Sequence, residues 1–213
     1  MMRIQALSTA NLAACQGLQA EEVIMVMPCT DVPLARRAAT LMAQRANAPG
    51  LLLLVEDLHQ WGFVRIANQV FAATQSRYFG YVAQDAFAGR QWLALALAAL
   101  AVPGKSLFGF NDGKWLGAFA AFGLAERQWA AQNYANGQLF HPAYQRHYAD
   151  VDMSILAMNQ GRYIHDSRSL LIEVDWHKDN ATADPQDRQL YRARVASGFD
   201  GRVANPQLLN LVS

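Results

Sequence analysis

The sequence predicts an α/β fold, a sheet flanked by helices in a single domain, and three observations support this. Continuous apolar runs alternate with helical segments through the first half, the pattern of buried parallel strands joined by crossover helices. Each of the first three runs is followed closely by acidic residues. The 213 residues, 53% hydrophobic and 16% charged, are enough to build one substantial core.

The first half predicts a β-α-β-α-β-α order. Residues 1–20 have weak periodicity and predict only a short helix or an extended lead-in. Asp31 is suited to cap the first helix and Pro33 to its first turn. The expected buried strands are 23–27, 51–55 and 78–83, and the expected helices are 33–46, 62–74 and 92–101.

The regular alternation of strand and helix patterns ends at Pro103-Gly104. We expect a nucleotide-binding half (22–104) and an acceptor-binding half (105–213) within the one domain. The last ten residues contain Pro206 and predict a weakly attached end. The expected strands are 106–110 and 170–174, and the expected helices are 124–131, 151–158 and 187–196.

Composition excludes several classes of function. A formal net charge of +1 gives no argument for nucleic acid or an anionic membrane as a partner. The longest apolar run, 92–102, is shorter than the roughly 20 residues that span a bilayer, so no integral membrane segment is expected. We interpret Cys15 and Cys29 as reduced thiols, although a disulfide stays open, and expect a cytoplasmic protein.

Acidic residues follow the three expected strands: Asp31 follows the first, Asp57 the second and Asp85 the third. Ligands of open α/β sheets bind outside the carboxyl ends of the strands. The pattern therefore predicts a site for a metal ion and a phosphorylated ligand at this edge.

Over residues 22–195 the order of motifs resembles the GT-A glycosyltransferases, especially the inverting family that uses nucleotide-diphosphate sugars. The matching segments are Met27-Pro28-Cys29-Thr30-Asp31, Val55-Glu56-Asp57, Tyr81-Val82-Ala83-Gln84-Asp85, Gly89-Arg90-Gln91-Trp92-Leu93, His147-Tyr148-Ala149-Asp150-Val151-Asp152-Met153 and Glu173-Val174-Asp175-Trp176-His177.

The resemblance implies a role for each matching residue. Asp85 lies in the place of the metal-binding DXD signature and His177 would complete the metal site, holding Mn²⁺ or Mg²⁺. Asp150 would be the general base, with Asp152 as the second candidate. The residues implied to bind the nucleotide are Pro28, Thr30, Asp57, Asn68, Gln84 and Asp85.

One departure from the family pattern concerns the metal. The first acid of a DXD signature falls at Ala83, so Asp85 alone remains, with Gln84 beside it. A one-carboxylate site is still workable, because a diphosphate supplies most of the oxygen ligands that a hard cation needs.

Structural alternatives stay open for these residues. Asp57 and Asp85 are also suited to loops or helix caps, and Asn68 to an exposed helix position. Asp150 and Asp152 also fit the start of a helix, where the macrodipole favours carboxylates. His177 is also typical of a surface residue.

The resemblance implies transfer of a sugar, from a donor that we expect to be of the UDP type, to a hydroxyl acceptor such as a bacterial surface glycan. Two rivals remain. A nucleotidyltransferase usually has a Gly-rich basic loop after its first strand, whereas Pro28–Pro33 has neither glycine nor a basic residue. A catalytically inactive GT-A-like binding protein is favoured by Ala83.

Overall fold

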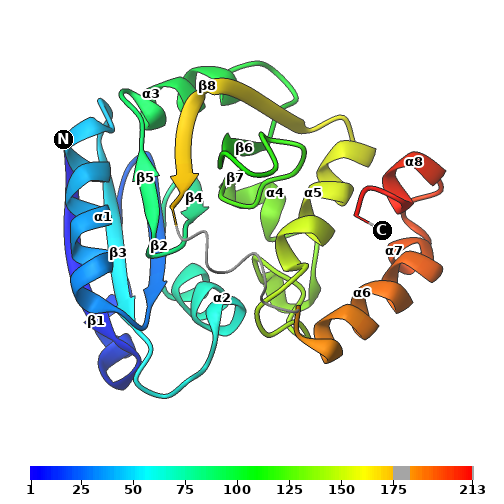
Figure 1. Cartoon of the computed structure of the whole chain (residues 1–213), viewed down its shortest axis with the longest axis horizontal. Helices are drawn as coiled ribbons and strands as arrows, with labels where there is room; N and C mark the ends of the chain where they lie inside the picture. The colour runs from blue at the N-terminus through cyan, green and yellow to red at the C-terminus, as the bar shows by residue number, and fades with distance from the viewer. Residues whose placement is uncertain (175–182, 213) are drawn as a thin grey trace.

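A mixed eight-stranded sheet forms the centre of the computed structural model, which describes residues 1–174 and 183–212 (Figure 1). Its strand order is β1-β3-β2-β4-β7-β6-β8-β5. The strands are β1 (Met2–Ser8), β2 (Val23–Cys29), β3 (Gly50–Glu56), β4 (Tyr78–Tyr81), β5 (Ala86–Ala88), β6 (Leu107–Asn111), β7 (Gly123–Glu126) and β8 (Tyr163–Glu173).

The sheet changes direction after its first four strands. Strands β1, β3, β2 and β4 run parallel to their neighbours. Strand β7 is antiparallel to both β4 and β6, while β8 runs parallel to β6 and antiparallel to β5. The carboxyl ends of β2, β3 and β4 therefore meet at one edge, where a ligand site is expected.

Helices cover both faces of this sheet, so the described residues form a single domain. Apolar side chains of α1 and α3 join one core cluster, and those of α2 and α5 join a cluster on the other face. The helices are η1 (Thr9–Cys15), α1 (Val32–Arg45), α2 (Phe63–Ala73), α3 (Trp92–Leu100), α4 (Arg127–Ala130), η2 (Ala135–Gly137), α5 (Ala149–Asn159), α6 (Pro185–Ala196), α7 (Gly198–Gly201) and α8 (Pro206–Leu209).

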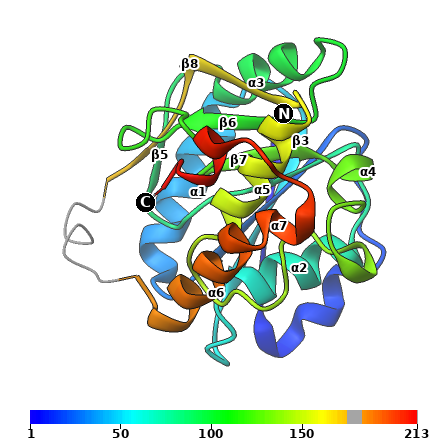
Figure 2. The ribbon, with the colours of Figure 1, turned by 90° about the vertical axis from the view of Figure 1, so that its right-hand side faces the viewer.

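The C-terminal helices gather on one side of the molecule. Figure 2 shows α6, α7 and α8 beside α5, at the end of the molecule that lies far from β1 in Figure 1. None of the helices in the described part of the chain is long and apolar enough to cross a membrane.

The strands and helices predicted between residues 23 and 101 are confirmed, with β4 ending at Tyr81, and the reasons are local. The side chains of β2 from Val23 to Met27 are fully buried, which is what a continuous apolar run between two helix layers requires. The Asp31 carboxylate caps α1 by accepting a hydrogen bond from the Leu34 N–H at 2.9 Å, and proline occupies the first turn.

Several predictions about elements were wrong or incomplete, and the strand predicted over 170–174 is the end of the longer strand β8. Residues 2–8 form the edge strand β1, in which only Met2 and Leu7 are buried, so it contains no continuous apolar run. Residues 123–126 pair with β4 and β6 as strand β7, so the predicted helix 124–131 is reduced to Arg127–Ala130. Strand β5 follows Asp85 and pairs with β8, which the sequence did not indicate.

The prediction of a weakly attached end was also wrong for the described residues. Helix α8 begins at Pro206, and Asn205 caps it by accepting from the Gln207 N–H at 3.0 Å. Leu209 and Val212 pack against the core cluster that includes α5. The C-terminal segment is therefore part of the domain.

Candidate active site

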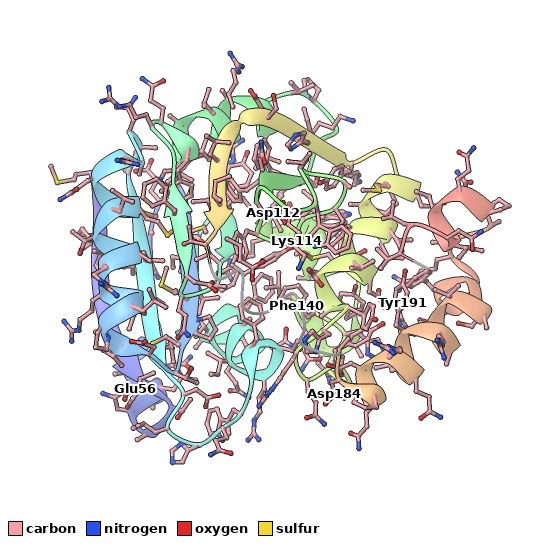
Figure 3. All side chains as sticks on the ribbon, in the orientation of Figure 1. Glu56, Asp112, Lys114, Phe140, Asp184 and Tyr191 are labelled. Atoms are coloured by element: carbon pink, nitrogen blue, oxygen red, sulfur yellow. The ribbon has the colours of Figure 1, made fainter. Side chains whose placement is uncertain are left out.

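A cleft of about 310 Å³ lies at the carboxyl edge of β2, β3 and β4. We call it the donor cleft, after the ligand that the resemblance implies for this edge of the sheet. Figure 3 labels Glu56, which ends β3 at this edge. The cleft brings together four of the six residues predicted to bind a nucleotide, Pro28, Thr30, Asp57 and Gln84.

Gln84 holds two strand ends together at the floor of the donor cleft. Its Oε1 accepts hydrogen bonds from the backbone N–H groups of Thr30, at 2.8 Å, and Asp31, at 2.9 Å. The side chain thereby ties the segment after β4 to the segment after β2. Within residues 1–174 and 183–212 its amide nitrogen makes no hydrogen bond, so it can contact a ligand.

Asp57 shapes the loop that leads into α2. Its two carboxylate oxygens accept from the backbone N–H groups of Trp61 and Gly62, each at 2.9 Å. Gly62 has φ of +80°, and a Cβ there would lie 3.0 Å from the Gln145 carbonyl oxygen, so glycine is required. Asp57 therefore acts as a loop cap while it also lines the cleft.

Asn68 lies outside the donor cleft. It is buried on α2, where its Nδ2 donates to the Phe140 carbonyl at 3.1 Å and its Oδ1 accepts from the Phe140 N–H at 2.9 Å. This pair of bonds fixes the loop before α5 against α2. These bonds give Asn68 a role in positioning that loop, and its contact with a nucleotide stays a prediction.

Asp85 is buried beside the cleft rather than in its lining. The residue is 2% exposed, and its carbonyl accepts from the Val174 N–H at 3.2 Å, which joins the end of β4 to the end of β8. His177 lies outside the described residues. Among the residues that are described, no group of three or more His, Cys, Asp or Glu side chains could hold a metal ion.

The donor set that is described therefore fits a divalent cation only in part. Asp85 is a single carboxylate in the expected place, and hard cations take six or more oxygen ligands. A bound diphosphate would have to supply most of them.

Asp150 lines a smaller pocket of about 120 Å³ that adjoins the donor cleft. Phe63 and Arg146 border both spaces. Burial raises the pKa of Asp150 to about 7, and the negative charges of Asp112 and Glu173 add to this, while nearby backbone N–H groups oppose it. A carboxyl group with this pKa is suited to take a proton near neutral pH.

Asp112 is itself held rigidly. It is 2% exposed, and its Oδ1 accepts from the backbone N–H groups of Lys114, Trp115 and Leu116 at 3.1, 2.8 and 3.0 Å. Figure 3 labels Asp112 and Lys114 near the centre of the molecule. The turn after β6 thus places a fixed negative charge near Asp150.

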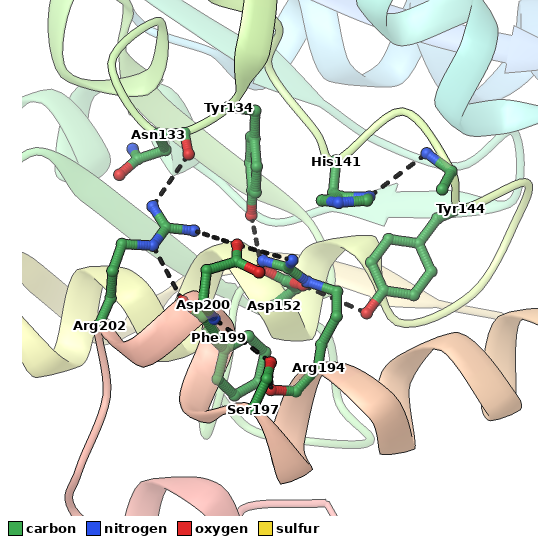
Figure 4. A network of polar contacts seen from close by, with 11 residues as sticks. Asn133, Tyr134, His141, Tyr144, Asp152, Arg194, Ser197, Phe199, Asp200 and Arg202 are labelled. Atoms are coloured by element: carbon green, nitrogen blue, oxygen red, sulfur yellow. Dashed lines mark hydrogen bonds and ion pairs between the residues drawn. The ribbon is translucent and has the colours of Figure 1, made fainter.

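Asp152 points away from this pocket into a buried network (Figure 4). It is fully buried and ion-paired with Arg194, whose side chain is 5% exposed. The hydroxyls of Tyr134 and Tyr144 donate to its two oxygens at 2.8 and 3.2 Å. Both oxygens of Asp152 therefore have partners within the buried network, and Asp152 does not line the pocket that contains Asp150.

Sequence reasoning missed Arg146 and the residue that positions it. The carboxylate of Asp187 on α6, which is 1% exposed, accepts from the backbone N–H groups of Gln145, Arg146 and His147 at 2.9, 2.8 and 2.8 Å. This contact fixes the loop that carries Arg146 over the two pockets. No local pattern could have revealed it, because about 40 residues separate the partners.

Cys29 lines the donor cleft, and its thiol is unreactive. Burial, followed by the charges of Glu56 and Asp31, raises the pKa of Cys29 to about 11. The thiol keeps its proton at neutral pH, so Cys29 is not an activated nucleophile.

Comparison with solved structures decides the fold. The mannosyltransferase PcManGT from Pyrobaculum calidifontis, solved in complex with GDP-Man and Mn²⁺, matches 89% of this chain and 68% of its own. The TM-score is 0.60 at 14% sequence identity. The chain has the GT-A glycosyltransferase fold.

Two structures of S. aureus TarS share this GT-A fold. One has a TM-score of 0.60 at 10% identity and covers 83% of this chain but 39% of the TarS chain. The other, of TarS 1–349, has a TM-score of 0.53 at 13% identity and covers 99% of this chain and 69% of that one. No family model and no curated protein matches the sequence.

Proposed function

We propose that the protein transfers a sugar, with inversion, from a nucleotide-diphosphate donor to a hydroxyl acceptor. The observation that carries this is the junction of the two pockets at Arg146, with Asp150 on one side and the strand ends on the other. The donor would bind the half 22–104 and the acceptor the half 105–213. The GDP-Man in the mannosyltransferase structure supports a nucleotide-sugar donor.

Two side chains would do the chemistry that the geometry allows. Asp150 would accept the proton of the attacking hydroxyl, which inverting transfer requires opposite the leaving group. Arg146, whose side chain makes no ion pair within the described residues, would contact the departing diphosphate through charge-assisted hydrogen bonds. A UDP-type donor and a bacterial surface glycan remain part of this proposal.

A divalent cation belongs to the proposal as well. Asp85, with His177, would hold Mn²⁺ or Mg²⁺, and the cation would stabilise negative charge on the leaving group. The Mn²⁺ of the mannosyltransferase complex supports this. We also propose a cytoplasmic location, which agrees with Cys15 and Cys29 being free thiols.

Product analysis tests the reaction type. With a panel of UDP and GDP sugars, we expect release of a nucleoside diphosphate that depends on a hydroxyl acceptor. Release of pyrophosphate from a nucleoside triphosphate and a sugar phosphate would instead identify a nucleotidyltransferase. Tight binding of a nucleotide sugar without turnover would identify an inactive binding protein.

Metal dependence can be measured without turnover. We expect Mn²⁺ to tighten nucleoside diphosphate binding, and Asp85→Asn to reduce that enhancement by about tenfold or more, because a charged contact is lost. Calorimetry with and without Mn²⁺ gives the enhancement for each variant. Glu56→Gln, at the end of β3, is the control and should keep it. Equal affinity with and without Mn²⁺ in the native protein would refute the metal bridge.

A further inference from the structure

A second cavity of about 480 Å³ lies between α6 and the C-terminal segment. We call it the α6 groove. Its volume is in the range of small-molecule sites. The groove is separate from the donor cleft and from the Asp150 pocket, because none of its lining residues lines either of them.

The walls of the α6 groove are apolar, and contacts between the side chains that form them hold them in place. The rings of Tyr148 and Tyr191 stack with centroids 4.7 Å apart and planes inclined by 14°. Val195 continues the wall along α6, and Leu209 and Val212 close it from the C-terminal segment. A hydrocarbon chain bound in the groove would be shielded from water by contacts on several sides, and this burial of apolar surface favours binding.

Two arginines give the α6 groove its charge. Arg188 and Arg192 are four residues apart on α6, so they lie on one face of the helix. Neither side chain makes an ion pair or a hydrogen bond within the part of the chain that is described, and none of the described residues that line the groove is acidic. Such a pair favours a phosphate, which guanidinium groups bind with parallel hydrogen bonds.

We propose that the α6 groove binds an amphiphilic phosphate, a phosphate ester with a hydrocarbon chain. Arg188 and Arg192 hold the phosphate, and the hydrocarbon lies along Val195, Leu209 and Val212. The groove is apolar where the chain lies and positively charged where the head lies, which fits this ligand better than a sugar or a free anion. The inference does not depend on glycosyl transfer.

Binding of monooctyl phosphate to the purified protein, measured by calorimetry below the micelle concentration, tests this directly. We expect saturable binding at one site, and at least tenfold weaker binding by the double variant Arg188→Gln/Arg192→Gln. Both side chains are at least partly exposed, so the variant should fold normally. Arg36→Gln/Arg37→Gln on α1 carries the same change in net charge and should bind like the native protein.

Two further probes separate the contributions of head and chain. Inorganic phosphate and 1-octanol should each bind much more weakly than monooctyl phosphate. Equal binding of inorganic phosphate would reduce the groove to an anion site, and equal binding of 1-octanol would reduce it to an apolar pocket; either result overturns the proposal. Absence of monooctyl phosphate binding, or unchanged binding by the Arg188→Gln/Arg192→Gln variant, overturns it as well.

Discussion

Asp150→Asn should lower turnover by roughly a hundredfold or more, the scale of a lost general base. Binding of the nucleotide should change little, because the donor cleft is built from other side chains. Steady-state kinetics with a donor and acceptor pair, together with calorimetry of the nucleotide, separates the two effects.

The expected pH dependence of turnover by the native protein follows from the same carboxyl group. Since burial raises the pKa of Asp150 to about 7, the base form exists above that pH, and the rate should rise with pH through about 7. Because the folded protein disfavours the ionised form of Asp150, ionisation also lowers the free energy of unfolding. This loss of stability grows as pH rises from the ordinary aspartate pKa through about 7. Asp150→Asn should therefore be more stable than the native protein at about pH 8 and similar at about pH 4.

Asp166 on β8 provides the matched control. Its pKa is lowered to about 2 by hydrogen bonds from Arg168, and its side chain lines neither pocket. Asp166→Asn should leave both the rate and its pH dependence unchanged. If Asp150→Asn retained full turnover, or if Asp152→Asn lost more turnover, the assignment of the base would be wrong.

Asp152→Asn should instead reduce the free energy of unfolding, by about 3–5 kcal/mol, because it leaves the buried Arg194 charge without its main partner. For a chain of this size the midpoint of thermal unfolding should fall by roughly 10 °C. Thermal denaturation measures the loss, and turnover at low temperature should decrease far less than in Asp150→Asn.

Asp200→Asn is the control for the buried pair. Asp200 contacts the same guanidinium at 3.0 Å, but its side chain is 65% exposed. Exposed ion pairs contribute at most about 1 kcal/mol, so this variant should unfold close to the native temperature. Equal losses for the two variants would contradict the view that burial makes Asp152 structural.

The parallel half of the fold could be predicted from the sequence because its signals are local. The runs at β2 and β3 are apolar throughout, and Pro49-Gly50 marks the break between α1 and β3. The grouping of Thr30, Asp57 and Gln84 in one cleft follows from the rule that parallel strands end at a common edge.

The remainder depends on contacts that no local pattern contains. Residues 123–126 include Leu, Ala and Glu, which favour helices, yet pairing with β4 and β6 on both sides makes them a strand. The partner of Asp152 lies 42 residues away on α6, so its burial could not be inferred from helix position alone. The direction of Asp150 and Asp152 to different sides of α5 was predictable, because helix periodicity fixes it.

The hydrogen bonds between Asp187 and the loop before α5 have a consequence for synthesis, because they determine at what length the growing chain can form the candidate site. Residues 145–147 leave the ribosome about 40 residues before the carboxylate that fixes their backbone. Until α6 has emerged, three N–H groups of that loop lack their buried acceptor, and Arg146 is not held over the two pockets. Nascent chains halted before residue 187 should thus possess β2, β3 and β4 but not the Asp187 contacts that fix residues 145–147, so the candidate site can be completed only after α6 has been synthesised.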